Sequence, residues 1–286
     1  MYLVACYCKN LYVIKCTNVA LSSAFHVLLM KNANIKEIWI QNPKCLMENL
    51  MKGVSLHKLS LLSTQGGTCL PGFPWSATAH STSLQRVECS FLKYCDSISM
   101  VHLTQNCRQL RSFSCRRIGF TDAHFEMFFV KPVGLLNLDI SSNNAVTDAG
   151  ILFIAQKLTS LRTLNIQYCT KLTHQCLAYL AENCTQLEVL YIDVVHADSA
   201  TAQAVHEFSL KCTSIKYLSI ISNFVLCSTT CTSSLIKGCP AMNTLVINKA
   251  ENICESGREL CKLLKPQLNI LTHDESTEYH VLKMPI

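Results

Sequence analysis

The chain has 286 residues, of which 49% are hydrophobic and 15% charged, and its formal net charge is +6. This composition excludes a disordered chain, because disordered segments are poor in apolar residues and rich in charge. The longest apolar stretch, residues 19–30, is too short and too interrupted for a membrane helix of about 20 residues. Residues 1–16 lack the charged start and cleavage site of a secretory signal. We therefore expect a cytoplasmic or nuclear protein with no membrane association, in which the 18 cysteines are reduced.

A short apolar pattern, Leu-x-x-Leu-x-Leu with other apolar residues allowed, recurs along the whole chain at intervals of 21 to 28 residues. Each match predicts a short strand with its apolar side inward, and each is followed by a segment with helical periodicity. The matches begin at Leu11, Ile35, Leu56, Leu84, Leu110, Leu135, Leu161, Leu187, Ile215, Met242 and Leu268.

Hydroxyl residues mark the starts of the predicted helices. Thr121, Thr147, Thr173 and Ser199 stand 26 residues apart. A hydroxyl at this place accepts a hydrogen bond from a helical amide that has no partner within the helix. One strand, one turn and one helix in about 26 residues is a leucine-rich repeat, and such units stack because none can bury its apolar face alone.

The predicted fold is an α/β leucine-rich-repeat solenoid, a horseshoe of about 10 or 11 repeats, with strands on the concave face and helices on the convex face. We place the solenoid at residues 1–271. Residues 63–83, rich in Gly, Pro and Ser, interrupt the helical pattern of the third repeat, and residues 272–286 form a tail or cap.

Eight of the cysteines fall in register with the repeats. Free cysteine behaves as a small buried hydrophobe, so we interpret these thiols as packing groups. Cys169 takes the strand-exit position that Asn143 takes one repeat earlier, where a small side chain can approach the turn backbone. The others fall at the third apolar strand position or three residues before a strand: Cys16, Cys89, Cys115, Cys107, Cys184, Cys212 and Cys239.

The blocks from Leu161 to Thr173 and from Leu177 to Leu187 resemble the cysteine-containing class of leucine-rich repeat. That class is typical of F-box and leucine-rich-repeat proteins, the substrate receptors of Skp–cullin–F-box (SCF) ubiquitin ligases, and of related F-box-less mitotic-exit antagonists. The resemblance extends from Leu84 to Ile247 and weakens at both ends. It implies a repeat fold and a substrate-recognition part in ubiquitin-dependent protein degradation.

Family members usually carry an F-box ahead of the first repeat, and the ten residues before Leu11 cannot contain that helical module. We therefore expect a fragment, or a member without the adaptor module. Skp adaptor and cullin are expected as partners only if an F-box is encoded upstream. The alternative function is a freestanding repeat scaffold or regulator with no ligase role.

Residues between the apolar strand positions should face the concave side and contact a protein substrate there. Exposed aromatic residues and arginines dominate the energetics of protein interfaces. Each candidate has an alternative interpretation, in which the side chain only paves or solvates the sheet. The candidates are Trp39, Arg86, Arg116, Asn137, Asp139, Asn165, Tyr191 and Tyr217.

Positive charge is concentrated in the first 120 residues, which hold 13 Lys and Arg against 4 Asp and Glu. A basic half could attract an acidic or phosphorylated protein segment toward the concave face. On this basis, we expect reversal of Arg116 to Glu to weaken partner binding with little effect on folding. The stripe is short and has little aromatic interleaving, which argues against nucleic acid as the partner.

No enzyme signature is found, neither a phosphate-binding glycine loop nor a zinc-protease or nucleophile-elbow motif. The pairs Cys6/Cys8 and Cys227/Cys231 lack a second pair at zinc-site spacing. We therefore expect a protein without catalytic residues, metal or cofactor, which acts by binding other proteins.

Overall fold

The computed structural model describes residues 10–18, 23–42, 55–62, 82–90, 106–129, 134–193, 199–220, 229–247, 253 and 255–272. Two compact units divide the chain, Met1–Asn143 (unit 1) and Asn144–Ile286 (unit 2). Most of the predicted irregular segment, residues 63–81, and the predicted tail beyond Thr272 lie outside the described residues.

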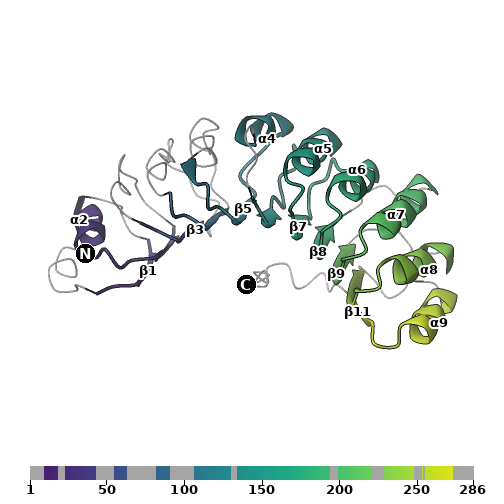
Figure 1. The fold of residues 1–286 in the computed structure, drawn as a ribbon. Helices are drawn as coiled ribbons and strands as arrows, with labels where there is room; N and C mark the ends of the chain where they lie inside the picture. The colour runs from purple at the N-terminus through teal and green to yellow at the C-terminus, as the bar shows by residue number, and fades with distance from the viewer. Residues whose placement is uncertain are drawn as a thin grey trace. The chain divides into compact units, whose positions relative to one another are not determined.

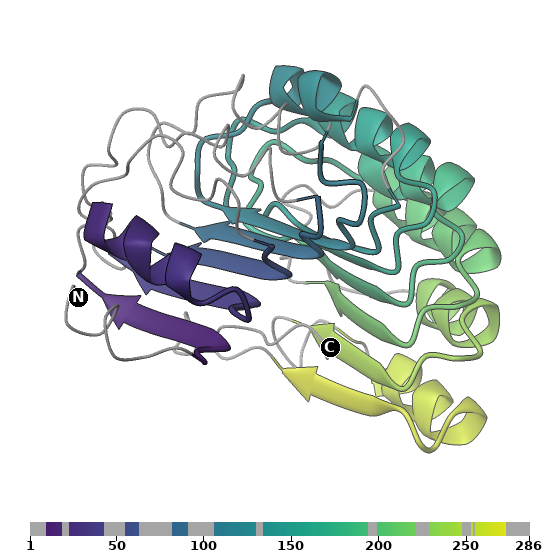
Figure 2. The same cartoon turned by 60° about the vertical axis from the view of Figure 1, so that its left-hand side comes forward.

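Unit 1 contains a parallel sheet whose strands follow one another in sequence order (Figures 1 and 2). Two helices are described beside it, α2 (Ser23–Lys31) and α4 (Asp122–Phe128). The strands are β1 (Val13–Thr17), β2 (Glu37–Gln41), β3 (Lys58–Leu62), β4 (Arg86–Ser90), β5 (Ser112–Arg116) and β6 (Asn137–Asp139).

Unit 2 repeats one plan, with a helix before each strand, and its helices pack side by side along one face of the parallel sheet (Figure 1). The strands are β7 (Thr163–Ile166), β8 (Val189–Ile192), β9 (Tyr217–Ile220), β10 (Thr244–Ile247) and β11 (Asn269–Thr272). The helices are α5 (Asp148–Lys157), α6 (Gln175–Asn183), α7 (Ser199–Lys211), α8 (Thr229–Gly238) and α9 (Glu255–Leu264).

The core of each unit is a row of apolar side chains that the strands contribute in register. In unit 1, Ile38, Leu59, Val87, Phe113 and Leu138 pair across the sheet and are at most 1% exposed. The matching row of unit 2 is Leu164, Leu190, Leu218 and Leu245. The alternate residues point to the opposite side of each sheet, which we call the strand-lined face.

The last repeat departs from the predicted register. The sequence pattern assigned Leu271 to an inward position, whereas the structure pairs Ile270 with the core residue Leu245. Because successive strand residues point to opposite faces, this one-residue shift turns Leu271 outward, where it is 51% exposed. Leu268 and Ile270 do not determine the strand register by themselves, because the segment has apolar residues at the positions that either register would turn inward.

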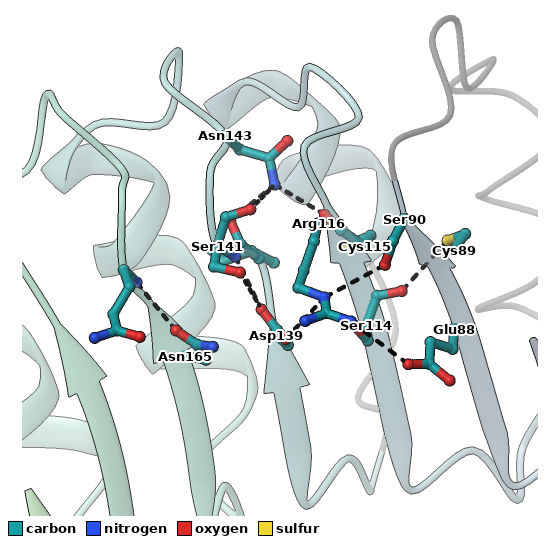
Figure 3. Close-up of polar contacts among 12 residues, drawn as sticks. Glu88, Cys89, Ser90, Ser114, Cys115, Arg116, Asp139, Ser141, Asn143 and Asn165 are labelled. Atoms are coloured by element: carbon teal, nitrogen blue, oxygen red, sulfur yellow. Dashed lines mark hydrogen bonds and ion pairs between the residues drawn. The ribbon is translucent and has the colours of Figure 1, made fainter. Parts of the chain in front are cut away.

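Two turns after strands hold a residue with positive φ followed by a buried residue, and in one of them the buried side chain, that of Asn143, binds turn backbone. Ser142 and Tyr168 have φ of 60° and 58°, and they precede Asn143 and Cys169. The Asn143 Oδ1 atom accepts the N–H groups of Ile118, Gly119 and Phe120 at 3.0–3.2 Å. Its Nδ2 atom donates to the carbonyl oxygens of Cys115 at 2.9 Å and Ile140 at 2.8 Å (Figure 3).

Predicted hydroxyl residues stand at the starts of three described helices: Thr121 and Thr147 are the N-cap residues of α4 and α5, and Thr173 directly precedes His174, the N-cap residue of α6. Thr147 accepts the N–H of Ala149, and Thr173 accepts the N–H of Gln175. Asp148, at the start of α5, also accepts the backbone N–H of Thr173 at 3.0 Å and its hydroxyl at 2.6 Å. The carboxylate therefore joins two successive repeats in addition to lying at the positive end of its own helix.

Buried thiols form a second connection between repeats. The Sγ atoms of Cys184, Cys212 and Cys239 each lie 3.6–4.0 Å from carbonyl oxygens of the repeat before. Burial raises the pKa of Cys184 and Cys212 to about 12 and that of Cys239 to about 11. These thiols are neutral donors packed in the core, as the sequence register predicted.

Candidate functional site

The strand-lined face of unit 1 carries two neighbouring rows of polar side chains, which the strand register brings together. One row runs Glu37, Lys58, Arg86, Ser112 and Asn137 from β2 to β6. The other row runs Lys15, Trp39, Ser60, Glu88, Ser114 and Asp139 from β1 to β6. Four of the eight predicted site residues, Trp39, Arg86, Asn137 and Asp139, therefore lie in these rows.

Trp39 on β2 lies between two lysines from the strands on either side. The Nζ atom of Lys58 lies 3.6 Å from the centre of the indole ring, and that of Lys15 lies 5.3 Å from it. The indole Nε1–H donates to Glu37 Oε2 at 3.2 Å. Cations over an indole ring are attracted by its electron-rich face. We call Lys15, Trp39, Lys58 and Arg86 the Trp39 cluster.

Two cations of this cluster oppose each other directly. Lys58 of β3 and Arg86 of β4 are register partners. Burial lowers the pKa of Lys58, and the charge of Arg86 lowers it further, while Glu88 and Glu37 act in the opposite direction. Like charges directly opposite each other destabilise a sheet. This arrangement therefore costs the fold some stability unless an anion reduces the repulsion.

Arg116, at the end of β5, joins the carboxylates of the two strands beside it (Figure 3). Its Nη2 atom lies 3.7 Å from Glu88 Oε1, and its Nε atom lies 3.5 Å from Asp139 Oδ2. The Nε–H also donates to Ser90 Oγ at 3.3 Å. We call Arg116, Glu88, Asp139 and the intervening Ser114 the carboxylate cluster.

Asp139 is the most buried member of the carboxylate cluster, with 6% of its side chain exposed. Burial raises the pKa of this carboxyl, and the charge of Arg116 opposes the rise. The hydroxyl and the N–H of Ser141 both donate to its Oδ1 atom, at 2.7 and 3.0 Å, and also favour the ionised form. Glu88 has a further partner in the hydroxyl of Ser60, which donates to its Oε2 atom at 2.8 Å.

These contacts correct one sequence-based expectation. From the sequence alone, Arg116 is predicted to belong to a basic patch, and its reversal to Glu is predicted to leave folding almost unchanged. In the structure it is the cation between two carboxylates, and its side chain is only 18% exposed. Reversal would place a third negative charge among Glu88 and Asp139, so it is expected to destabilise the fold as well as change binding.

The strand-lined face of unit 2 has a different chemistry, built on aromatic rings and amides. The rings of Tyr191 (β8) and Tyr217 (β9) lie with their centres 4.9 Å apart and tilted by 45°. Tyr191 is only 6% exposed, contrary to the expectation of an exposed aromatic. Tyr217 is half-buried, and burial raises the pKa of its phenol.

Asn165 on β7 belongs to the same face but has a structural contact. Its Oδ1 atom accepts the backbone N–H of Gln167 at 3.1 Å (Figure 3). The side chain of Gln167 in turn donates to Ser219 Oγ at 3.3 Å. Asn165 is 6% exposed, so its amide mainly shapes the strand exit.

Asp193, just after β8, was not among the predicted site residues. Its Oδ2 atom accepts the N–H of Tyr168 at 2.7 Å, while its Oδ1 atom is buried and has no hydrogen-bond partner within the described part of the chain. Burial raises the pKa of this carboxyl to about 7. The sequence pattern places Lys58, Glu88 and Asp193 at outward strand positions, but they were not among the predicted site residues, and neither was Lys15, because their contacts depend on strand pairing.

Among the residues that the structure describes, no group of three or more His, Cys, Asp or Glu side chains is placed to hold a metal ion. The cysteines of the pairs Cys6/Cys8 and Cys227/Cys231 other than Cys231 lie outside those residues. Within the same ranges, no helix has the length and apolar character needed to cross a membrane.

Solved structures share this fold. Rad7 from yeast, solved in a complex with Elc1, matches 94% of this chain and 76% of its own, with a TM-score of 0.56 at 13% identity. An internalin (InlF) of Listeria monocytogenes matches 91% of this chain and 65% of its own, with a TM-score of 0.55 at 20% identity. No family model and no curated protein matches the sequence. The predicted α/β leucine-rich-repeat solenoid is thereby confirmed.

Proposed function

We propose that this chain is a non-catalytic protein-interaction module that binds a partner protein on the strand-lined face of unit 1. The observation that carries the proposal is the Trp39 cluster, in which an indole ring, two lysines and an arginine share one open side of the sheet. Tryptophan and arginine are enriched among the residues that dominate binding energy at protein interfaces. Protein binding is also the common use of stacked repeats, which present extended surfaces.

The finer proposal is that the partner is a substrate and that the chain is the recognition part of an SCF-type ubiquitin ligase. Its support is the resemblance of the repeats to the F-box and leucine-rich-repeat class. A solved structure of the same fold, yeast Rad7, was determined in a complex with Elc1, so a protein that contains this fold can assemble with a second protein. The ligase chemistry would come from the partners, because the chain offers no catalytic motif in its sequence.

Co-purification tests the ligase proposal. The natural full-length product is isolated from its own cells, and Skp adaptor and cullin are quantified beside it. Recovery of both in stoichiometric amounts supports a substrate receptor. Their absence, together with recovery of another protein bound to the strand-lined face, supports the alternative of a freestanding scaffold.

Substitution of Trp39 tests the binding face itself. Trp39→Ala should weaken the affinity for the recovered partner by about 30-fold, since interface residues of this kind contribute about 2 kcal/mol or more to the binding free energy. The matched control is Lys157→Ala on helix α5, which removes a lysine that lies 5.7 Å from the ring of Phe153. Equal affinities for both variants, with unchanged thermal stability, would place the partner elsewhere and end the proposal.

A further inference from the structure

The two clusters on the strand-lined face of unit 1 carry unbalanced charges of opposite sign. In the Trp39 cluster, neither Lys15, Lys58 nor Arg86 has an ion pair with any described carboxylate. Glu37 is the nearest acidic neighbour along the row, and it accepts the indole N–H. Three cations therefore face Glu37 and Glu88, and Lys58 and Arg86 repel each other across one strand pair. A single added carboxylate between them would satisfy an arginine fork and reduce that repulsion.

The carboxylate cluster has two carboxylates and only one cation among its members. Glu88 and Asp139 share one guanidinium, and its contacts of 3.7 and 3.5 Å are longer than the 2.7–2.9 Å of a close charged hydrogen bond. Ser114 lies between the two carboxylates in register, is 6% exposed, and its hydroxyl has no partner among the described residues. The unpaired Ser114 hydroxyl, beside two carboxylates that share one guanidinium, can accept a hydrogen bond from one more donor with positive charge.

We infer that the strand-lined face of unit 1 binds an extended partner segment at two points, with an acidic side chain on Lys58 and Arg86 and a basic side chain on the carboxylate cluster. This inference rests on the proposed protein-binding function and specifies its partner. The acidic residue forms a salt bridge with Arg86 and Lys58 beside the Trp39 ring. The basic residue donates toward Glu88, Asp139 and Ser114, next to Arg116.

The register sets the spacing of the two side chains. Neighbouring strands lie about 4.8 Å apart and alternate residues of one strand lie about 6.7 Å apart, so the two points are separated by roughly 10 Å. A segment in the polyproline II conformation covers about 9 Å in three residues and returns every third side chain to the same side, whereas the side chains of a β-strand alternate between two sides. The partner motif is therefore an acidic residue and a basic residue separated by two others.

A nucleic acid fits this surface less well than a peptide. A strand that placed one phosphate on the Trp39 cluster would bring its neighbours toward Glu88 and Asp139, which repel them. The cation of Lys58 already lies over the indole ring, where a base would otherwise stack. The alternation of charge selects a segment that carries both signs.

Defined peptide pools provide the test. Twelve-residue pools with neutral positions carry a fixed Asp-x-x-Lys or Lys-x-x-Asp pair, Asp alone, Lys alone, or phosphoserine alone, and each is fluorescently labelled. Binding to the full chain is measured by anisotropy, with a single-stranded oligonucleotide as a further probe. We expect one of the two paired pools to bind at least about tenfold more tightly than every single-charge pool, since one charged hydrogen bond contributes that much.

Substitutions in the protein then test which residues bind the acidic side chain and which bind the basic side chain of the peptide. Lys58→Gln with Arg86→Gln should remove the advantage of the peptide Asp, and Glu88→Gln should remove that of the peptide Lys. In a double-mutant cycle, the Lys58 and Arg86 substitutions must reduce affinity only for peptides that carry Asp, and the Glu88 substitution must reduce affinity only for peptides that carry Lys. Lys157→Gln and Glu188→Gln are the matched controls, because both residues belong to unit 2 and to neither cluster, and neither should change any affinity. Thermal melts verify that each variant is folded.

Several results would overturn the inference. They are equal binding of the Asp-only pool and the paired pools, tighter binding of phosphoserine or the oligonucleotide than of any paired pool, and losses that do not couple. The proposed function has its own readout in the natural partner. If that partner is lost on Trp39→Ala but binds normally to the Lys58, Arg86 and Glu88 variants, the two-point inference fails while protein binding on this face stands.

Discussion

The strand-lined faces of the two units use the same backbone plan for different chemistry. That of unit 1 carries four cations and three carboxylates, whereas the described part of that of unit 2 carries one charged residue, Asp193, among tyrosines and amides. Both faces bury an aspartate, but only Asp139 has a cation beside it. The repeat therefore fixes where a side chain points and leaves its charge free to vary.

The largest expected effect concerns the apolar core row that lies behind the strand-lined face of unit 2. Leu164→Asp in unit 2 should destabilise the protein by more than about 4 kcal/mol, because it buries an unpaired charge at a fully covered position. Hydrogen exchange should show loss of protection in β7, β8 and the helices beside them. Leu210→Asp is the control, since Leu210 is 60% exposed. Normal protection in Leu164→Asp would contradict the register of the core row.

A smaller effect is expected where the two units satisfy the strand exit differently. Asn143→Ala removes an amide that accepts three N–H groups and donates to two carbonyl oxygens, all within unit 1. We expect a loss of about 2–4 kcal/mol in the free energy of unfolding by urea titration. Asn165→Ala should cost about 1 kcal/mol, because that side chain accepts one backbone N–H. Comparable losses in the two variants would show that the Asn143 bonds are not made.

The buried aspartates predict a difference in pH dependence. Asp193 has a pKa of about 7 in the folded protein, well above the value near 3.9 of an unfolded chain. The neutral carboxyl thus contributes stability that is complete below about pH 4 and lost as the pH rises through about 7. Asp193→Asn should raise the free energy of unfolding at pH 8 by about 1–3 kcal/mol, which is measured as a higher melting temperature. At pH 4 the substitution should leave the melting temperature nearly unchanged.

The paired aspartate of unit 1 is the matched comparison for that experiment. Asp139→Asn should show a smaller gain at pH 8, because Arg116 and Ser141 offset the cost of burying its charge. An equal gain in both variants would mean that the Arg116 contact contributes nothing to the ionised form.

The smallest effect is expected at an exposed ion pair. Glu188 lies 2.9 Å from Arg162 and 2.6 Å from Lys216, but both cations are more than half exposed. Glu188→Gln should change the free energy of unfolding by less than about 1 kcal/mol, and 1 M salt should remove the difference. The bond from Lys216 lowers the pKa of Glu188, so any stabilisation is present at neutral pH and lost as the carboxyl protonates in acid. A large, salt-insensitive loss would show that this pair is structural.

The sequence predicted the fold because the period was set by buried leucines, whose spacing is visible in one dimension. It also predicted the helix starts at Thr147 and Thr173 from their hydroxyl groups. The pattern failed at Leu271, where apolar neighbours at consecutive positions allow either register. A one-residue shift cannot be detected when both faces of a strand are apolar.

The candidate site was less accessible to sequence reasoning. Trp39 and Arg86 were selected by residue type, and they remain predicted binding residues. The role of Arg116 could not be foreseen, because Glu88 and Asp139 stand 28 and 23 residues away and meet it only through strand pairing. Aligning the outward positions of successive repeats as rows would have shown the opposed pair Lys58 and Arg86.

The buried thiols of unit 2 can report the opening of the repeats that contain them. Cys184, Cys212 and Cys239 stay protonated and covered while their repeats are packed, so alkylating reagents meet no thiolate there. Brief labelling along a denaturant series, followed by mass mapping, would therefore record the order in which successive repeats open. A spectroscopic dye would not be needed, because natural residues at known heights in the stack supply the signal.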